Sequence, residues 1–299
     1  MTQSSEQVAD VYPTRTGGEF LLMPREDFVV HGTADDGPLD GEELEDFTQN
    51  GYLTFPEFFT PTEVTALGDE LERMATDPEI LAQDSTIVDQ ASHEVRTIFG
   101  VHRTSEVFHA VAHDPRLVDR ARQILGTDVY IHQSGANTKP GLTGDDVYWH
   151  SDFETWHAED GMPRMRAVSF TIALSDFHSF NSPLMIMPGS HTTYVSCGDI
   201  VPTQQEKALL DMHGSGTPSP AALEQLADRH GIEVLEGGPG SAVLFDSNSM
   251  HGSGGNISPY PSSTLYFVYN SVENEPVEPY SGQARRPEFL GARDFTPVP

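Results

Sequence analysis

Apolar residues in the first third of the chain recur at the three- and four-residue spacing of an amphipathic helix. The clearest run follows Thr60-Pro61-Thr62-Glu63, which has the form of a capping box with proline at the first helical position. The apolar positions of this run are Val64, Leu67, Leu71 and Met74. The pattern predicts helices over residues 40–49, from residue 61 onward and over residues 117–125.

From residue 129 onward the pattern changes to short apolar or alternating runs, separated by Gly, Pro, Asn and Ser. Such runs are typical of β-strands joined by turns. We expect a mainly β fold with surrounding helices, an antiparallel sandwich or jelly roll. The expected strands cover residues 52–55, 129–133, 147–152, 165–174, 184–187, 242–245 and 264–269, and two helices interrupt them at 204–212 and 221–231.

A dinucleotide-binding fold would need strands that alternate regularly with helices and a glycine fingerprint after the first strand. The glycine-rich run Gly252-Ser253-Gly254-Gly255 comes late in the chain and no helix follows it. This run therefore indicates a turn. We expect the Gly- and acid-rich residues 1–40 to form a loose arm. Residues 41–299 would form one domain, with a helical part at 41–126 and a jelly-roll core at 127–299.

The charge of the chain limits its partners. The 299 residues include 16 Lys and Arg against 46 Asp and Glu, a formal net charge of −30. This balance argues against binding to nucleic acid or to an anionic membrane surface. We find no run of 18 apolar residues and no secretory signal, and the single cysteine, Cys197, rules out an internal disulfide. We expect a cytoplasmic protein.

The densest chemical stretch surrounds His150 and Asp152, which are separated by one residue. On a strand this spacing places both side chains on one face. His251 follows the apolar run 242–245 after a short connection. Two histidines and a carboxylate are the donor set of the facial triad that holds Fe(II) and leaves three positions open for a co-substrate and O₂. A hydrogen-bonded His–Asp pair at a strand edge is the alternative. We expect His132, His157 and His191 to have structural roles.

The run Trp149 to Pro163, WHSDFETWHAEDGMP, resembles the signature segment of ectoine hydroxylases. These are Fe(II)/2-oxoglutarate dioxygenases of the phytanoyl-CoA-hydroxylase type. The resemblance extends from about residue 95 to about residue 293. It includes Tyr130-Ile131-His132-Gln133-Ser134, Lys139-Pro140-Gly141, Pro188-Gly189-Ser190-His191, Met250-His251-Gly252-Ser253 and Arg286-Pro287-Glu288-Phe289.

The resemblance implies a double-stranded β-helix, which is a cupin-like jelly-roll barrel. It also implies a homodimer. Its iron ligands would be His150, Asp152 and His251. The reaction would hydroxylate ectoine to 5-hydroxyectoine with release of succinate and CO₂. The residues assigned to 2-oxoglutarate would be Lys139, Asn137 and Ser253, and those assigned to the substrate would be Gln133, Trp156, Phe99, Phe245 and Arg286.

The chemistry of these residues agrees with the assigned roles. The far carboxylate of 2-oxoglutarate needs a cation, and Lys139 is one of only two lysines in the chain. Ectoine is a small ring that carries a carboxylate and a cationic amidine. Trp156 and Phe245 offer aromatic faces to a cation, and Gln133 offers both a donor and an acceptor.

The chain departs from the pattern of these relatives at three positions near the expected pocket. Ser262 stands where many relatives have an arginine for the far carboxylate, Gly135 where a large basic residue is usual, and Val147 where an aromatic residue is usual. Removal of one partner from a buried ion pair costs about 2–5 kcal/mol. An oxygenase for another small amphoteric or amino-acid-like molecule therefore stays open as an alternative, as does a metal-binding sensor without turnover.

Overall fold

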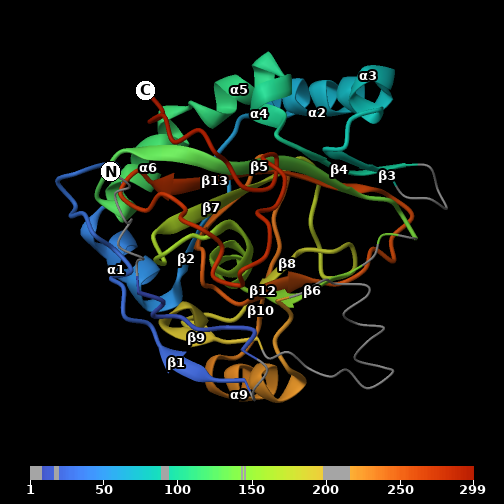
Figure 1. Cartoon of the computed structure of the whole chain (residues 1–299). Helices are drawn as coiled ribbons and strands as arrows, with labels where there is room; N and C mark the ends of the chain where they lie inside the picture. Colours follow the sequence, from blue (N-terminus) through green and yellow to red (C-terminus); the bar gives the residue numbers. More distant parts are fainter. Residues whose placement is uncertain (1–8, 17–19, 89–93, 143, 145, 198–215) are drawn as a thin grey trace.

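The computed structural model describes residues 9–16, 20–88, 94–142, 144, 146–197 and 216–299. Two antiparallel sheets face each other as a jelly-roll barrel (Figure 1). The larger sheet has the strand order β2-β11-β7-β13-β5-β4-β3, and the smaller has the order β10-β8-β12-β6. The larger sheet consists of β2 (Tyr52–Phe55), β3 (Thr86–Val88), β4 (Val95–Phe99), β5 (Val129–Lys139), β7 (Ala167–Ala173), β11 (Ala242–Asp246) and β13 (Ser262–Ser271), and the smaller of β6 (Val147–His150), β8 (Leu184–Ile186), β10 (Glu233–Leu235) and β12 (His251–Ser253).

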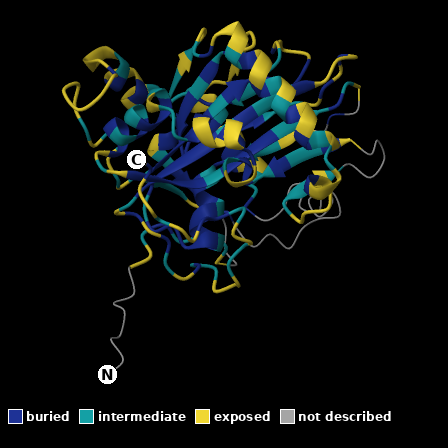
Figure 2. Cartoon of the chain, turned by 90° about the horizontal axis from the view of Figure 1, so that it is seen from above, coloured by how far each residue is buried: buried dark blue, intermediate teal, exposed yellow. Residues whose placement is uncertain are grey.

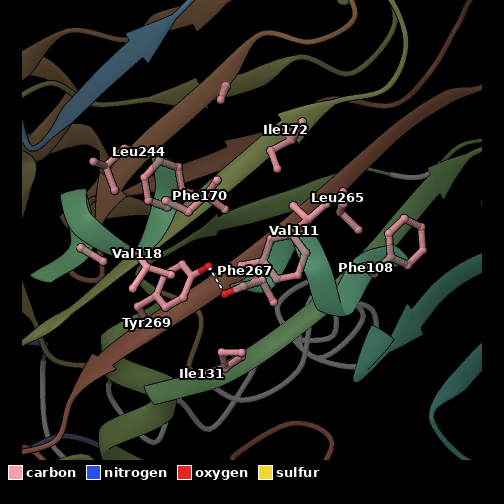
Figure 3. Packing of buried hydrophobic residues seen from close by; sticks show 14 of the residues in the cluster. Phe108, Val111, Val118, Ile131, Phe170, Ile172, Leu244, Leu265, Phe267 and Tyr269 are labelled. Carbon is pink, nitrogen blue, oxygen red and sulfur yellow. Dashed lines mark hydrogen bonds between the residues drawn. The ribbon is translucent and has the colours of Figure 1, made fainter. Parts of the chain in front are cut away.

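The larger sheet has one apolar face and one polar face, because side chains alternate along each strand. In β13, Leu265, Phe267 and Tyr269 are buried in the apolar core, whereas the residues between them line a cavity. The same alternation in β7 and β11 adds Phe170, Ile172 and Leu244 to the core (Figure 3). The jelly roll predicted from the sequence is thereby confirmed.

Helices from the first third of the chain cover the apolar face of this sheet (Figure 1). Figure 2 shows them with exposed outer sides above the buried strands.

The predicted helix caps are present, since Asp40 and Thr60 each form a capping box at the start of their helices. The helices are α1 (Gly41–Asn50), α2 (Pro61–Thr76), α3 (Pro78–Leu81), α4 (Val101–Thr104), α5 (Glu106–Ala112), α6 (Pro115–Leu125), α7 (Asp152–Thr155), α9 (Pro220–His230), the π-helix η1 (Trp156–Asp160) and the 3-10 helix η2 (Ser190–Thr192).

Several expected elements have different bounds. The strand expected at 129–133 continues to Lys139, because β13 pairs with it along its whole length. The strand expected at 147–152 ends at His150, and the chain enters α7 at Asp152. The helix expected at 204–212 lies outside the described residues. Within the described residues, no helix is both long and apolar enough to cross a membrane.

The segment expected as a loose arm is packed against the domain where the structure describes it. Tyr12 is buried, and β1 (Leu22–Pro24) pairs with β9 (Thr193–Val195). Arg25 forms a buried ion pair with Asp246, at 2.8 Å between Nη1 and Oδ2. A buried aromatic ring and a paired guanidinium hold the described part of this segment in place, whereas composition alone suggested a loose arm.

Candidate metal centre and its cavity

Three side chains from separate elements converge at one end of the cavity. His150 is the last residue of β6, His251 is the first residue of β12, and the two are paired across the smaller sheet. The Asp152 Oδ1 atom lies 3.5 Å from His150 Nε2 and 4.0 Å from His251 Nε2. Their potential ligand atoms all lie within 4.8 Å of one another. The structure therefore brings the predicted triad together.

The sequence interpretation of the His150–Asp152 spacing was wrong in its geometry. The two residues do not share one strand face, because Ser151 ends the strand and caps α7 by accepting from the Glu154 N–H. The Phe153 N–H donates to the Ser247 carbonyl at 2.9 Å and fixes this turn against the loop before β12. The turn, rather than strand alternation, directs the Asp152 carboxylate toward the two histidines.

Both imidazoles are oriented by backbone carbonyls. His150 Nδ1 donates to the Tyr148 carbonyl at 2.8 Å, and His251 Nδ1 donates to the Ser249 carbonyl at 3.0 Å. A carbonyl can only accept, so each Nδ1 carries the proton and each Nε2 lone pair faces the centre. The Ser169 hydroxyl donates to Asp152 Oδ2 at 3.3 Å. This donor set fits a ferrous ion and leaves coordination positions for other ligands.

The protonation states of His251 and Asp152 also suit a metal. Burial and the adjacent His150 lower the pKa of His251 to about 4. Burial disfavours the charged form of Asp152, but the two histidines and Ser169 hold the pKa of its carboxyl below the ordinary value. Burial likewise opposes the charge on His150, yet Asp152 raises the pKa of that imidazole. At neutral pH the centre thus presents neutral His251 and an ionised Asp152, the forms that bind metal.

The cavity beside this centre has a volume of about 720 Å³. Its floor is the polar face of the larger sheet, where Gln133, Asn137 and Lys139 of β5 point the same way. Directly opposite on β13, Ser262 is paired with Lys139 and Thr264 with Asn137. Most of the predicted site residues line the cavity together, namely Lys139, Asn137, Ser253, Gln133, Trp156, Phe99 and Phe245.

Arg286 differs from the other predicted residues because it does not line this cavity. Its Nε donates to Asp160 Oδ1 at 2.9 Å, and Glu159 Oε2 lies 3.7 Å from the same nitrogen. Its guanidinium still acts electrostatically on Asp152 and on Tyr266 of β13. Arg286 is therefore a charged neighbour of the cavity that two carboxylates hold in position.

Lys139 extends toward the end of β12, the strand that begins at His251. Its Nζ donates to Ser253 Oγ at 2.7 Å and to the Gly254 carbonyl at 3.1 Å. The hydroxyl of Ser262, across from it, is buried and has no hydrogen-bond partner among the described residues. A cation and an unpaired hydroxyl thus lie on neighbouring strands at the same end of the cavity.

Sequence reasoning missed several residues of the cavity wall. Arg96, Ser169, Thr264 and Tyr266 all line the cavity. The alternation along β7 and β13 would have placed the last three on the polar face. The remaining candidate histidines lie outside the metal centre, as expected. His157 stacks on Tyr280 with ring centroids 4.0 Å apart.

A jelly roll that presents two histidines and one carboxylate at the wall of a cavity defines the class of non-haem iron oxygenases. The family described as Phytanoyl-CoA dioxygenase (PhyH) matches residues 47–261, and the chain belongs to this family. It is 50% identical to the ectoine dioxygenase of Streptomyces coelicolor, over 100% of both chains. It is 46% identical to the ectoine dioxygenase of Halomonas elongata, over 94% of this chain and 85% of that protein.

Comparison with solved structures gives the same family. The crystal structure of EctD from S. alaskensis with 2-oxoglutarate and 5-hydroxyectoine superposes with a TM-score of 0.88 at 41% identity, over 97% of both chains. The structure of the same protein with bound Fe gives a TM-score of 0.85, over 96% of this chain and 95% of that chain. The family resemblance inferred from the sequence is thereby confirmed.

Proposed function

We propose that this protein is an ectoine hydroxylase, which converts ectoine to 5-hydroxyectoine and 2-oxoglutarate to succinate and CO₂. The observation that carries the proposal is the oriented triad beside a cavity, in a chain that matches ectoine dioxygenases over its whole length. His150, Asp152 and His251 would hold iron(II). With 2-oxoglutarate and O₂, the iron supplies the oxidant that replaces a C–H hydrogen by hydroxyl.

The co-substrate subsite lies where Lys139, Asn137 and Ser253 meet. The Lys139 ammonium, already held by Ser253, would pair with the far carboxylate of 2-oxoglutarate. Asn137 accepts a hydrogen bond from the Thr97 hydroxyl at 2.9 Å, which orients its amide so that the NH₂ group remains a donor. The unpaired Ser262 hydroxyl offers one more donor at this end.

The substrate subsite lies between the metal centre and the wall formed by Gln133, Trp156, Phe245 and Phe99. The Phe245 ring packs on His251 with centroids 4.9 Å apart, so a substrate against this ring is also close to the metal ligands. The aromatic faces suit the cationic amidine of ectoine, and Gln133 provides a donor and an acceptor. Arg286, beside Asp160, would attract the carboxylate of the substrate through its charge.

The deciding experiment incubates the purified protein with Fe(II), ascorbate, 2-oxoglutarate and ectoine. We expect mass spectrometry to show ectoine with one added oxygen, together with an equal amount of succinate. Unchanged ectoine alongside turnover of another small amphoteric compound would instead indicate an oxygenase of different specificity. Iron binding without succinate from any compound would indicate a sensor.

We also infer a cytoplasmic homodimer. The net charge of −30 favours a dissolved protein that does not bind nucleic acid or anionic membranes. Light scattering at the salt concentration of the assay should give twice the chain mass of 32.8 kDa. A mass of one chain would contradict the dimer and leave the proposed reaction unaffected.

A further inference from the structure

Gly135 on β5 lies between two aromatic residues of the larger sheet. Its paired neighbour on β4 is Phe99, and its paired neighbour on β13 is Tyr266. A Cβ atom on Gly135 would come within 2.5 Å of the Tyr266 hydroxyl and within 2.7 Å of its ring. Tyr266 therefore leans over the glycine and occupies the space that a side chain at position 135 would need.

The Tyr266 side chain belongs to the cavity wall. Among the residues that the structure describes, none forms a hydrogen bond with its hydroxyl. By contrast Tyr269, three residues further along β13, donates to the Ala112 carbonyl at 2.9 Å. Burial raises the pKa of the Tyr266 phenol, which therefore stays protonated and remains a donor at any pH at which the enzyme works.

When a ligand fills the cavity, it shields the Tyr266 hydroxyl from water. The ligand must then offer a hydrogen-bond acceptor, because a buried donor without an acceptor weakens binding. The protonated amidine of a ring such as ectoine offers only N–H donors, so its carboxylate is the group that can accept from a phenol. Two charges act on Tyr266, the ionised Asp152 more strongly and the Arg286 guanidinium less, so the guanidinium offsets part of the repulsion that Asp152 exerts on a carboxylate here.

We propose that the Tyr266 hydroxyl donates a hydrogen bond to the carboxylate of the substrate, and that the absence of a side chain at Gly135 permits this contact. The inference rests on the proposed function and identifies a specificity-determining pair within the same site. The contact comes from the Tyr266 phenol, which lies over Gly135.

The test is Tyr266→Phe, which removes the hydroxyl and retains the ring. We expect the KM and the anaerobic dissociation constant for ectoine to rise about tenfold or more, as for a lost hydrogen bond to a charged group. The kcat and the KM for 2-oxoglutarate should change less than about twofold, since the lost contact is equally strong in ground and transition states. The carboxamide of ectoine accepts only a neutral hydrogen bond from the phenol, so the affinity for it should fall less in the variant than the affinity for ectoine.

Tyr269→Phe is the matched control, because it removes a hydroxyl from the same strand on the core side. It should lower thermal stability and leave the KM for ectoine unchanged. Gly135→Ala should raise the KM for ectoine in wild type and much less in Tyr266→Phe, because it acts by displacing the phenol.

An unchanged KM for ectoine in Tyr266→Phe would overturn the inference, as would a selective rise in the KM for 2-oxoglutarate. An equal loss of affinity for ectoine and its carboxamide would also overturn it. If the wild type does not hydroxylate ectoine at all, the proposed function itself fails, and the wild-type assay alone reveals this before any variant is compared.

Discussion

The metal centre and the cavity wall of β5 and β13 are held in place in different ways. Each metal ligand has a hydrogen-bond partner in the protein, such as the Ser249 carbonyl for His251 and the Ser169 hydroxyl for Asp152. On the wall, the Ser262 hydroxyl has no hydrogen-bond partner within the described residues, and Gly135 has no side chain. A metal ion binds only when donors of the right type lie at the right positions, so its ligands can vary little. In the wall of a cavity, one polar side chain can replace another.

The largest effect is expected from Asp152→Ala. Loss of a metal ligand should reduce ectoine hydroxylation by about 1000-fold or more, beyond the roughly 10- to 100-fold typical of groups that only orient a ligand. Iron content after gel filtration should fall in parallel. Asp46→Ala, an exposed aspartate of α1, is the control and should behave as wild type. Full activity in Asp152→Ala would remove this carboxylate from the metal centre.

On the wall, Lys139→Ala should raise the KM for 2-oxoglutarate on the order of 100-fold or more, because the far carboxylate loses its charge partner. The KM for ectoine should change little. Arg96→Ala is the informative comparison, since Arg96 also lines the cavity. A larger effect of Arg96→Ala than of Lys139→Ala would assign the far carboxylate to the guanidinium.

Removal of iron by a chelator tests whether the metal centre is formed by the protein itself. Because backbone carbonyls orient both histidines, we expect the near-ultraviolet circular dichroism to remain that of the folded protein. The Tm should fall by a few degrees, since a ligand that binds only the folded state stabilises it. Loss of the tertiary signal would show that the ion is needed to fold this end of the barrel.

The smallest effect is expected from Ser262→Ala. Its hydroxyl is buried and has no partner in the part of the chain that the structure describes, so its removal should leave the free energy of unfolding unchanged or slightly raised. The KM for 2-oxoglutarate should rise about twofold to tenfold if the hydroxyl donates to the co-substrate. Ser169→Ala, by contrast, removes a partner of Asp152 and should lower kcat. An unchanged KM in Ser262→Ala would leave the far carboxylate to Lys139.

Local signals were sufficient for most of the secondary structure. The caps at Asp40 and Thr60 and the apolar spacing of α2 depend on residues within one or two turns, and the structure has them as predicted. Strand ends were less predictable. The residues after Gln133 form no clear strand pattern, and pairing with β13 and β4 extends β5 to Lys139. Composition also misrepresented the segment before residue 40, because Arg25 is stabilised by Asp246, more than 200 residues away in sequence.

The sequence by itself determined which donors could bind a metal and several of the polar residues that line the cavity, because these depend on side-chain chemistry and on motif. Only the tertiary structure decided that a helix start presents Asp152, that Asp160 engages Arg286, and that Tyr266 covers Gly135. Those facts depend on turns and on strand register, which set distances between residues far apart in the chain.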